Sequence, residues 1–196
     1  MDERLKKQLG FLIEVDKMKS VLRQTLLVNK TKREDDAEHS WHFALMAMIL
    51  YEYTGPAKVD LPRVMKMALV HDLIEIYAGD TFAYDEKGNE SKGLRESAAA
   101  DRLFAMLPPD QGDEIRTLWE EFDAMETMDA RYAAAIDRLQ PFLNNCMTEG
   151  HTWRLGGVTG AQVYKRMDMV RVAMPEVWPF VAENIEDAIE KGYIKA

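Results

Sequence analysis

Apolar residues recur every three or four positions along nearly the whole chain, and this spacing predicts amphipathic helices. No stretch sustains the alternation of apolar and polar residues, enriched in Val, Ile and Thr, that is typical of strands. The sequence therefore predicts an all-α protein, a helical bundle without internal repeats. The expected helices cover residues 5–15, 37–53, 61–79, 94–107, 111–122, 159–171 and 175–191, with another that begins at 128 and contains Asp137.

Cap and turn residues set the expected ends of these helices. The expected N-caps are Asp35 or Asp36, Asp60, Asp110 and Thr127. Gly55–Pro56 is a glycine-then-proline terminator, and residues 29–36 are polar enough to predict a loop. The polar segment 79–93 follows the helix of residues 61–79 and is a candidate lid. Pro141 removes one helical hydrogen bond and should bend its helix close to Asp137.

Composition narrows the class of protein. A chain of 196 residues fits one domain, here with a core at about residues 35–145 and terminal helices packed on it. The formal net charge of −9 argues against binding to polymeric nucleic acid, although it leaves room for a locally positive pocket. Cys146 is the only cysteine, and the chain starts without the pattern of a signal peptide, so we expect a cytoplasmic protein. No apolar run approaches the roughly 20 residues of a membrane span.

The doublet His71–Asp72 is the strongest chemical signal, because it lies inside an apolar helical stretch. A carboxylate buried there is costly unless it is paired or bound to a metal. His39 and Asp137 lie on other helices in apolar surroundings and are the natural partners. Imidazole and carboxylate donors together suit a divalent ion such as cobalt, manganese, iron, zinc or magnesium. The sequence thus predicts a metal-dependent hydrolase with one ion.

Blander explanations exist for single residues of this set. A His–Asp dipeptide arises by chance, and a buried histidine is often satisfied by a neighbouring carbonyl group. His42 lies three residues after His39, but we expect it to be structural rather than a ligand. His151 is expected in a surface loop.

Four motifs, in this order, resemble those of the HD-domain phosphohydrolases, and more closely their branch of 5'-deoxynucleotidase-like proteins. The motifs are Glu38-His39-Ser40, His71-Asp72-Leu73-Ile74-Glu75, Gly79-Asp80-Thr81 and Ala135-Ile136-Asp137-Arg138-Leu139. The resemblance covers most of the chain. It implies that one divalent ion is held by His39, His71, Asp72 and Asp137.

The resemblance also implies roles for residues around the ion. Glu75 is implied to be catalytic, and its position four residues after His71 would put it on the metal-facing side of a helix. Asp80 matches a carboxylate near the nucleotide sugar and the catalytic water. Arg23 matches an arginine that grips the substrate phosphate, a task suited to its planar fork of donors. Gln24 stands where family members similar to the characterised deoxynucleotidases have a tryptophan implicated in nucleotide recognition, so the phosphate chemistry is better supported than a preference for deoxynucleotides.

These observations predict hydrolysis of a phosphate monoester, with a nucleoside 5'-monophosphate as the small-molecule substrate and nucleoside and phosphate as products. Two alternatives stay open: an HD phosphodiesterase, and a non-catalytic helical protein that uses the metal or a nucleotide as a scaffold or sensor. Homodimerisation is expected from the resemblance, and the terminal helices could supply the surface through Met167, Met169, Val170, Trp178 and Phe180.

Overall fold

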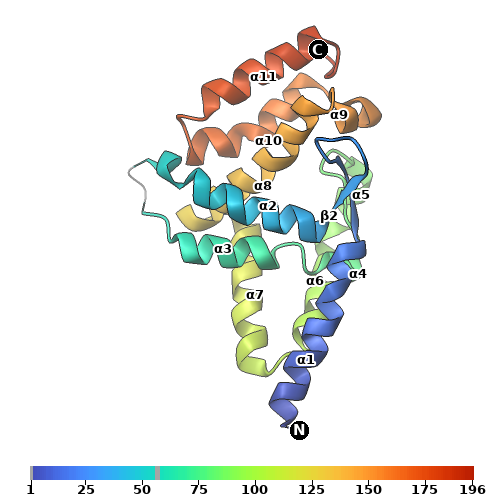
Figure 1. Ribbon diagram of the computed structural model, residues 1–196, viewed down its shortest axis with the longest axis vertical. Coiled ribbons are helices and arrows are strands. Elements are labelled where there is room, and N and C mark those ends of the chain that lie inside the picture. Colours follow the sequence, from blue (N-terminus) through green and yellow to red (C-terminus); the bar gives the residue numbers. More distant parts are fainter. Residues whose placement is uncertain (1, 56–57) are drawn as a thin grey trace.

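Helix α8 (Met128–Met147) is the central element of the computed structural model, which describes residues 2–55 and 58–196. It packs against α2, α3, α7 and α10 (Figure 1). The predicted all-α class is confirmed. The other α-helices are α1 (Glu3–Val15), α2 (Asp36–Ile49), α3 (Leu61–Val70), α4 (Glu75–Ala78), α5 (Glu86–Glu90), α6 (Lys92–Phe104), α7 (Pro109–Ala124), α9 (His151–Gly156), α10 (Gly160–Ala173) and α11 (Trp178–Glu190), and 3-10 turns cover η1 (Asp16–Ser20) and η2 (Tyr51–Thr54).

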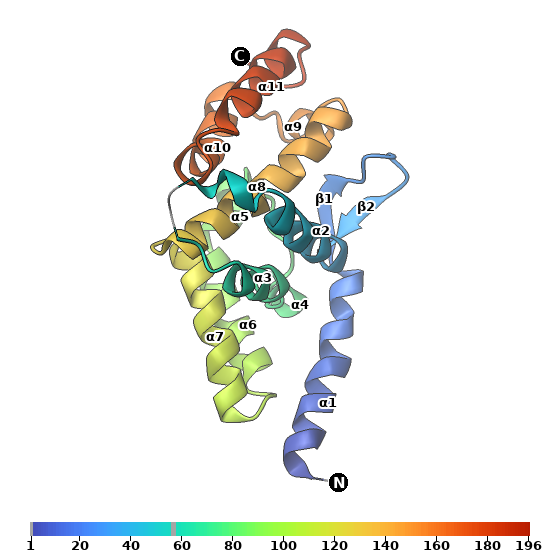
Figure 2. The same cartoon turned by 60° about the vertical axis from the view of Figure 1, so that its left-hand side comes forward.

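A short antiparallel ribbon corrects the expectation of a loop before α2. Strand β1 (Leu22–Leu26) pairs with β2 (Arg33–Asp35), with Leu22 opposite Asp35 and Leu26 opposite Arg33. The Arg33 guanidinium reinforces the pair by donating to the carbonyl oxygen of Leu22 at 2.8 Å. Strands this short leave too few positions for an alternating pattern to emerge. The ribbon projects beside the start of α2 (Figure 2). Its strand β1 carries Arg23, whose Nη1 lies 2.7 Å from Asp72 Oδ2.

The expected helix of residues 61–79 is wrong as a single element. α3 ends at Val70, residues 71–74 form a turn, and α4 begins at Glu75. The turn is held by backbone hydrogen bonds that span three residues instead of the four of an α-helix. The N–H of Leu73 donates to the carbonyl oxygen of Val70 at 3.2 Å, and the N–H of Glu75 donates to that of Asp72 at 2.9 Å. Neighbours on a regular helix point about 100° apart. The turn therefore gives His71 and Asp72 a freedom to face the same point that a continuous helix would not.

Most of the predicted helix starts are present. Asp35 caps α2 and forms a reciprocal capping box with Glu38, and Asp60 and Thr127 cap α3 and α8. Asp110 lies in the first turn of α7 instead of capping it, because that helix starts at Pro109, before Asp110 rather than after it. The terminator at Pro56 lies outside the described residues.

The core gathers the apolar faces of these helices. Its largest fully buried side chains come from elements far apart in sequence, among them Phe43, Met67, Leu103, Ile136 and Trp153. Within the described residues, the helices are too short or too polar to cross a bilayer.

Candidate metal centre

Four side chains from three regions of the chain converge at one point. His39 comes from the first turn of α2, His71 and Asp72 from the turn after α3, and Asp137 from the middle of α8. His39 Nε2 lies 3.1 Å from Asp137 Oδ1 and 3.9 Å from Asp72 Oδ2. His71 Nε2 lies 3.1 Å from Asp72 Oδ2 and 3.7 Å from Asp137 Oδ1. The structure thus brings the four predicted ligands together, with His39, His71 and Asp72 forming a cluster able to hold an ion.

Both imidazole rings are oriented by hydrogen bonds at their other nitrogen. His39 Nδ1 lies 3.0 Å from Gln140 Oε1, and His71 Nδ1 lies 3.0 Å from the carbonyl oxygen of Ala68. Each acceptor favours the tautomer with the proton on Nδ1, which leaves the Nε2 lone pair facing the cluster. His71 Nε2 is buried and has no hydrogen-bond partner among residues 2–55 and 58–196. The residues present therefore fit a divalent ion with mixed nitrogen and oxygen donors.

Neighbouring imidazole and guanidinium groups keep the carboxylates of Asp72 and Asp137 ionised. Burial raises the pKa of Asp137, but the adjacent imidazole rings of His39 and His71 outweigh it and hold the pKa well below its ordinary value. Burial likewise raises the pKa of Asp72, and the charges of His71 and Arg23 lower it further than burial raises it. Burial lowers the pKa of His71, whereas Asp72 and Asp137 raise it to about 10. In the absence of an ion, a proton on His71 provides the positive charge between these carboxylates.

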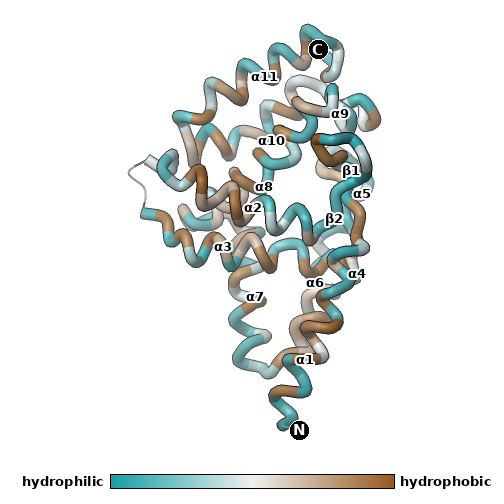
Figure 3. The backbone as a smooth tube through the Cα atoms, viewed as in Figure 1, coloured by the Kyte–Doolittle hydropathy of each residue, from teal (hydrophilic) through white to brown (hydrophobic). Residues whose placement is uncertain are grey.

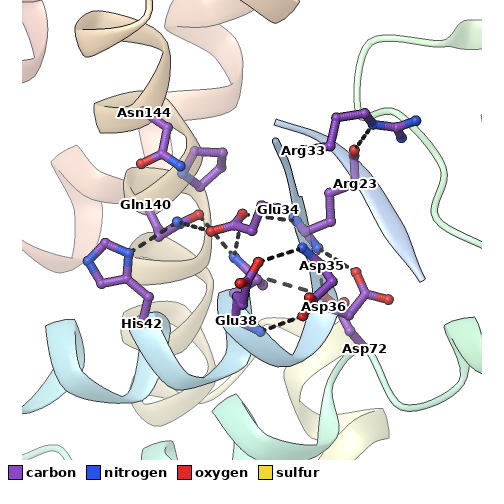
Figure 4. Close-up of polar contacts among 12 residues, drawn as sticks. Arg23, Arg33, Glu34, Asp35, Asp36, Glu38, His42, Asp72, Gln140 and Asn144 are labelled. Atoms are coloured by element: carbon purple, nitrogen blue, oxygen red, sulfur yellow. Dashed lines mark hydrogen bonds and ion pairs between the residues drawn. The ribbon is translucent and has the colours of Figure 1, made fainter. Parts of the chain in front are cut away.

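Arg23 joins the ribbon to this cluster and is surrounded by acids (Figure 4). Its Nη1 lies 2.7 Å from Asp72 Oδ2 and 3.5 Å from Asp36 Oδ1, and its Nε lies 3.6 Å from Glu34 Oε2. Its side chain is only 12% exposed, and Glu34 and Asp36 are buried. Burial raises the pKa of Glu34 to about 7 and also raises that of Asp36, where the charge of Asp72 adds to it. The guanidinium compensates these acids and fixes Asp72 in place.

Gln140 is the link between His39 and the acids behind it. While its Oε1 faces His39, its Nε2 donates to Glu34 Oε1 at 2.6 Å and lies 3.2 Å from His42 Nδ1 (Figure 4). His42 thus lies on the far side of Gln140 from the cluster, as its expected structural role requires. His151 is not in a loop, because it is the half-buried first residue of α9.

Glu75 and Asp80 stand next to the four converging side chains. Glu75 is buried, and no residue in the described part of the chain hydrogen-bonds to its Oε2. Burial raises its pKa strongly, and the charges of Asp72 and Asp36 raise it further, so its carboxyl group favours the protonated form. Asp80, in the loop after α4, is half-buried, and burial raises its pKa as well. Both carboxyl groups line the same cavity as His71 and Asp72.

The cavity over the cluster has a volume of about 180 Å³. A second cavity of about 580 Å³ lies beside it and shares four lining residues with it: Gln24, Phe82, Tyr84 and Thr152. Residues 79–90 form one wall. They are tied down by Arg95, which donates to the oxygen of Ala78 at 2.7 Å and to Thr81 Oγ1 at 2.9 Å. The candidate lid is therefore anchored at this end.

Several lining residues were missed by the sequence analysis. Lys92, Arg138 and Arg166 are cations in the wall of the first cavity, whereas Glu34, Asp36 and Gln140 hold Arg23 or His39 from behind. Glu34 and Asp36 lie in a run of charged residues that is also typical of a solvated loop and helix cap. The signal available for Gln140 and Arg138 was their nearness in sequence to Asp137 on a helix.

Comparison with known proteins places this site in a family. The model of the HD domain matches residues 15–178, and the chain belongs to the HD-domain family. It is a metal-dependent phosphohydrolase, a hydrolytic enzyme. A crystal structure from Magnetospirillum magnetotacticum MS-1, described as a predicted metal-dependent phosphohydrolase, is 48% identical with a TM-score of 0.93 over 98% of this chain and 96% of that one.

Curated relatives are more distant. The 5'-deoxynucleotidase HDDC2 of Xenopus laevis is 30% identical over 139 residues, which are 70% of this chain and 67% of the relative. The protein of the same name from Mus musculus is 31% identical over 136 residues, 69% of this chain and 66% of that protein. The aligned part of the chain thus spans about two thirds of the length of these relatives.

Proposed function

We propose that this enzyme hydrolyses nucleoside 5'-monophosphates to nucleoside and inorganic phosphate, with one divalent ion held by His39, His71, Asp72 and Asp137. The observation that carries the proposal is the convergence of two imidazole nitrogens and two carboxylate oxygens beside a cavity that Glu75 also lines. Such an ion, when bound, polarises a phosphoryl oxygen and lowers the pKa of a bound water. The donor set suits manganese, iron, cobalt or zinc better than magnesium.

Glu75 is proposed as the proton donor to the leaving group. As the bond between phosphorus and the 5'-oxygen breaks, that oxygen becomes an alkoxide and needs a proton. The buried Oε2 of Glu75 has no partner among the residues that the structure describes, and burial raises the pKa of this carboxyl group strongly, which favours the protonated form. Asp80, on the same wall, is proposed to hold the sugar or the attacking water. Arg23 keeps Asp72 in position and adds positive charge near the phosphate.

The size and lining of the two adjoining cavities support a nucleotide as substrate. The first cavity, at the cluster, is small and polar and suits a phosphate group. The second is larger and is lined by Phe82 and Tyr84, whose ring centroids lie 5.4 Å apart, and by Gln24. Aromatic faces and an amide suit a sugar and base. The relatives named 5'-deoxynucleotidase also support this substrate class, although Gln24 leaves the choice between ribose and deoxyribose open.

A nucleotide panel tests the proposal. Protein freed of metal and resupplied separately with cobalt, manganese, iron, zinc or magnesium is assayed for phosphate release from ribo- and deoxynucleoside 5'-monophosphates. Glu75→Gln is expected to lose turnover and keep its metal content, whereas Glu183→Gln, on an exposed face of α11, keeps both. Metal binding without release from any monophosphate would favour the scaffold or sensor. Cleavage of cyclic dinucleotides with monoesters spared would favour the phosphodiesterase.

A homodimer is proposed as the working assembly, with a surface different from the one expected from sequence. Of the five residues expected there, Met167 and Val170 are buried in the core, Met169 and Trp178 are half-buried, and Phe180 is 47% exposed. Large apolar side chains are instead exposed on two helices: Trp41, Leu45, Met48 and Ile49 on α2, and Leu5, Leu9, Leu12 and Ile13 on α1. The hydropathy colouring of Figure 3 shows hydrophobic positions along both helices. Sedimentation of the wild type and Trp41→Glu tests this, because a monomeric wild type contradicts it. The cytoplasmic location stays a prediction.

A further inference from the structure

Two arginines line the first cavity on the side of Asp137. Arg166 projects from α10, and its Nη2 lies 3.9 Å from Asp137 Oδ2. Arg138 follows Asp137 on α8 and donates from Nη1 to the carbonyl oxygen of Arg166 at 3.4 Å. Both arginines, from packed helices, therefore line the first cavity beside the cluster, and both also line a third cavity that opens next to it.

These arginines differ from Arg23 in how their charge is compensated. Arg23 has carboxylate oxygens of Glu34, Asp36 and Asp72 within 3.6 Å. In residues 2–55 and 58–196, Arg166 has a single ion pair, the long one to Asp137, and Arg138 has none. The second guanidinium contact of Arg138 is to the sulfur of Met125, a weak acceptor. A metal ion bound by Asp137 would compete with Arg166 for the Asp137 carboxylate.

Two like charges near each other with little counter-charge are unfavourable, and an anion bound by both reduces that cost. A guanidinium presents paired donors that match the oxygens of a phosphate group. The Arg166 side chain is 31% exposed, compared with 12% for Arg23, so its donors are open to a ligand. The position next to Asp137 places those donors where a phosphoryl group at the metal centre would lie.

We propose that Arg166, supported by Arg138, binds the phosphoryl oxygens of the substrate and selects phosphate monoester dianions. This rests on the proposed function and adds two residues to it. The two sides of the cavity then have different tasks: Arg23 holds Asp72, and the Arg166–Arg138 pair supplies the free N–H donors.

Binding of inorganic phosphate tests the pair without depending on turnover. Protein loaded with one equivalent of manganese and freed of excess metal is titrated calorimetrically with inorganic phosphate. Arg166→Gln is expected to weaken binding by about 10- to 100-fold, as for loss of charge-assisted hydrogen bonds, and Arg138→Gln by about 5-fold or more. Arg171→Gln removes the same charge from the exposed end of α10, where Arg171 pairs with Asp168, and is expected to stay within about 2-fold. Manganese content should be the same in all variants.

An Arg166→Gln affinity within about 2-fold of wild type overturns the proposal. If that variant fails to fold, Arg166→Lys takes its place: it keeps the charge but loses the planar fork, and undiminished phosphate binding again counts against the pair. Kinetics separate this proposal from the proposed function. A wild type that binds phosphate through Arg166 but releases none from any nucleotide refutes the function alone. Turnover with an unchanged KM in Arg166→Gln refutes the role of the arginine alone.

Discussion

Replacing Gln140 with leucine is expected to weaken metal binding through His39, a residue that Gln140 orients without contacting the ion site itself. The side chain is fully buried, accepts from His39 Nδ1 at 3.0 Å and donates to Glu34 Oε1 at 2.6 Å. Leucine has a similar volume but neither polar group. The change therefore leaves a buried imidazole N–H and a buried carboxyl oxygen without partners.

The structure sets the size of the effect. A buried polar group left without its partner costs about 1–3 kcal/mol, so two such groups lower the free energy of unfolding of the metal-free protein by about 2–6 kcal/mol. His39 is also no longer held in the tautomer that points its Nε2 lone pair at the cluster. Loss of such an orienting partner typically weakens metal binding by about 10- to 100-fold.

Two measurements separate these effects. Urea unfolding of the metal-free protein gives the stability, and competition with a chromophoric chelator gives the metal affinity. Gln140→Glu keeps an acceptor for His39 but places a second carboxyl group against Glu34, so it should retain metal affinity and lose stability. Gln8→Leu is the matched control, because it removes one amide hydrogen bond, to Gln111, far from the site. A folded Gln140→Leu protein that binds metal as tightly as wild type would refute the orienting role.

Three further outcomes follow from the same contacts. Chelation of the ion should lower the melting temperature by roughly 5–10 °C, because metal at about 100 times its Kd stabilises by about 2.7 kcal/mol, and differential scanning fluorimetry measures this. The pKa of Glu34 is raised from 4.5 to about 7, so its contribution to stability is full below pH 4.5 and is lost as the pH rises through 7; Glu34→Gln should therefore gain up to about 3 kcal/mol relative to wild type between pH 5 and 8 in urea titrations, and a constant difference would contradict this. Leu103→Ala in the core should cost about 2–5 kcal/mol of unfolding free energy, and Leu94→Ala on the same helix, 81% exposed, less than about 0.5.

The amphipathic helices could be predicted from sequence because each buries one face, and burial imposes the three- and four-residue spacing directly. The break after Val70 could not. It contains no proline or glycine, and its stretch Val70-His71-Asp72-Leu73-Ile74 has the apolar content of a buried helix. The helix ends there in a turn that lets the side chains of His71 and Asp72 face one point. This arrangement is useful only because His39 and Asp137 reach the same point from other helices, which local sequence does not show.

The candidate site divides in the same way. The four converging side chains were predicted because they belong to motifs that a resemblance could identify, and Asp72 was conspicuous as a charge in an apolar run. Arg166 and Lys92 carry no such signal, because an arginine or lysine on a helix normally faces solvent, and the motif around Asp137 contains Arg138 without indicating a role for it. Their place in the cavity wall is a result of how α6, α8 and α10 pack. The buried positions of Glu34 and Asp36 were not predicted, because acidic residues at the start of a helix usually act as caps.

The burial of Glu34 and Asp36 around Arg23 is costly by itself, because the hydration free energy that charges lose on burial is offset only by close partners of opposite charge. The arrangement makes sense as a support for Asp72. Arg23 Nη1 reaches Asp72 Oδ2 at 2.7 Å, and the same oxygen lies 3.1 Å from His71 Nε2. Glu34 in turn accepts from Gln140, which orients His39. One chain of contacts therefore runs from the β-ribbon through the buried acids to both sides of the cluster. The sequence pattern did not predict the ribbon, yet the ribbon helps to fix the geometry of the four converging side chains that the sequence did predict.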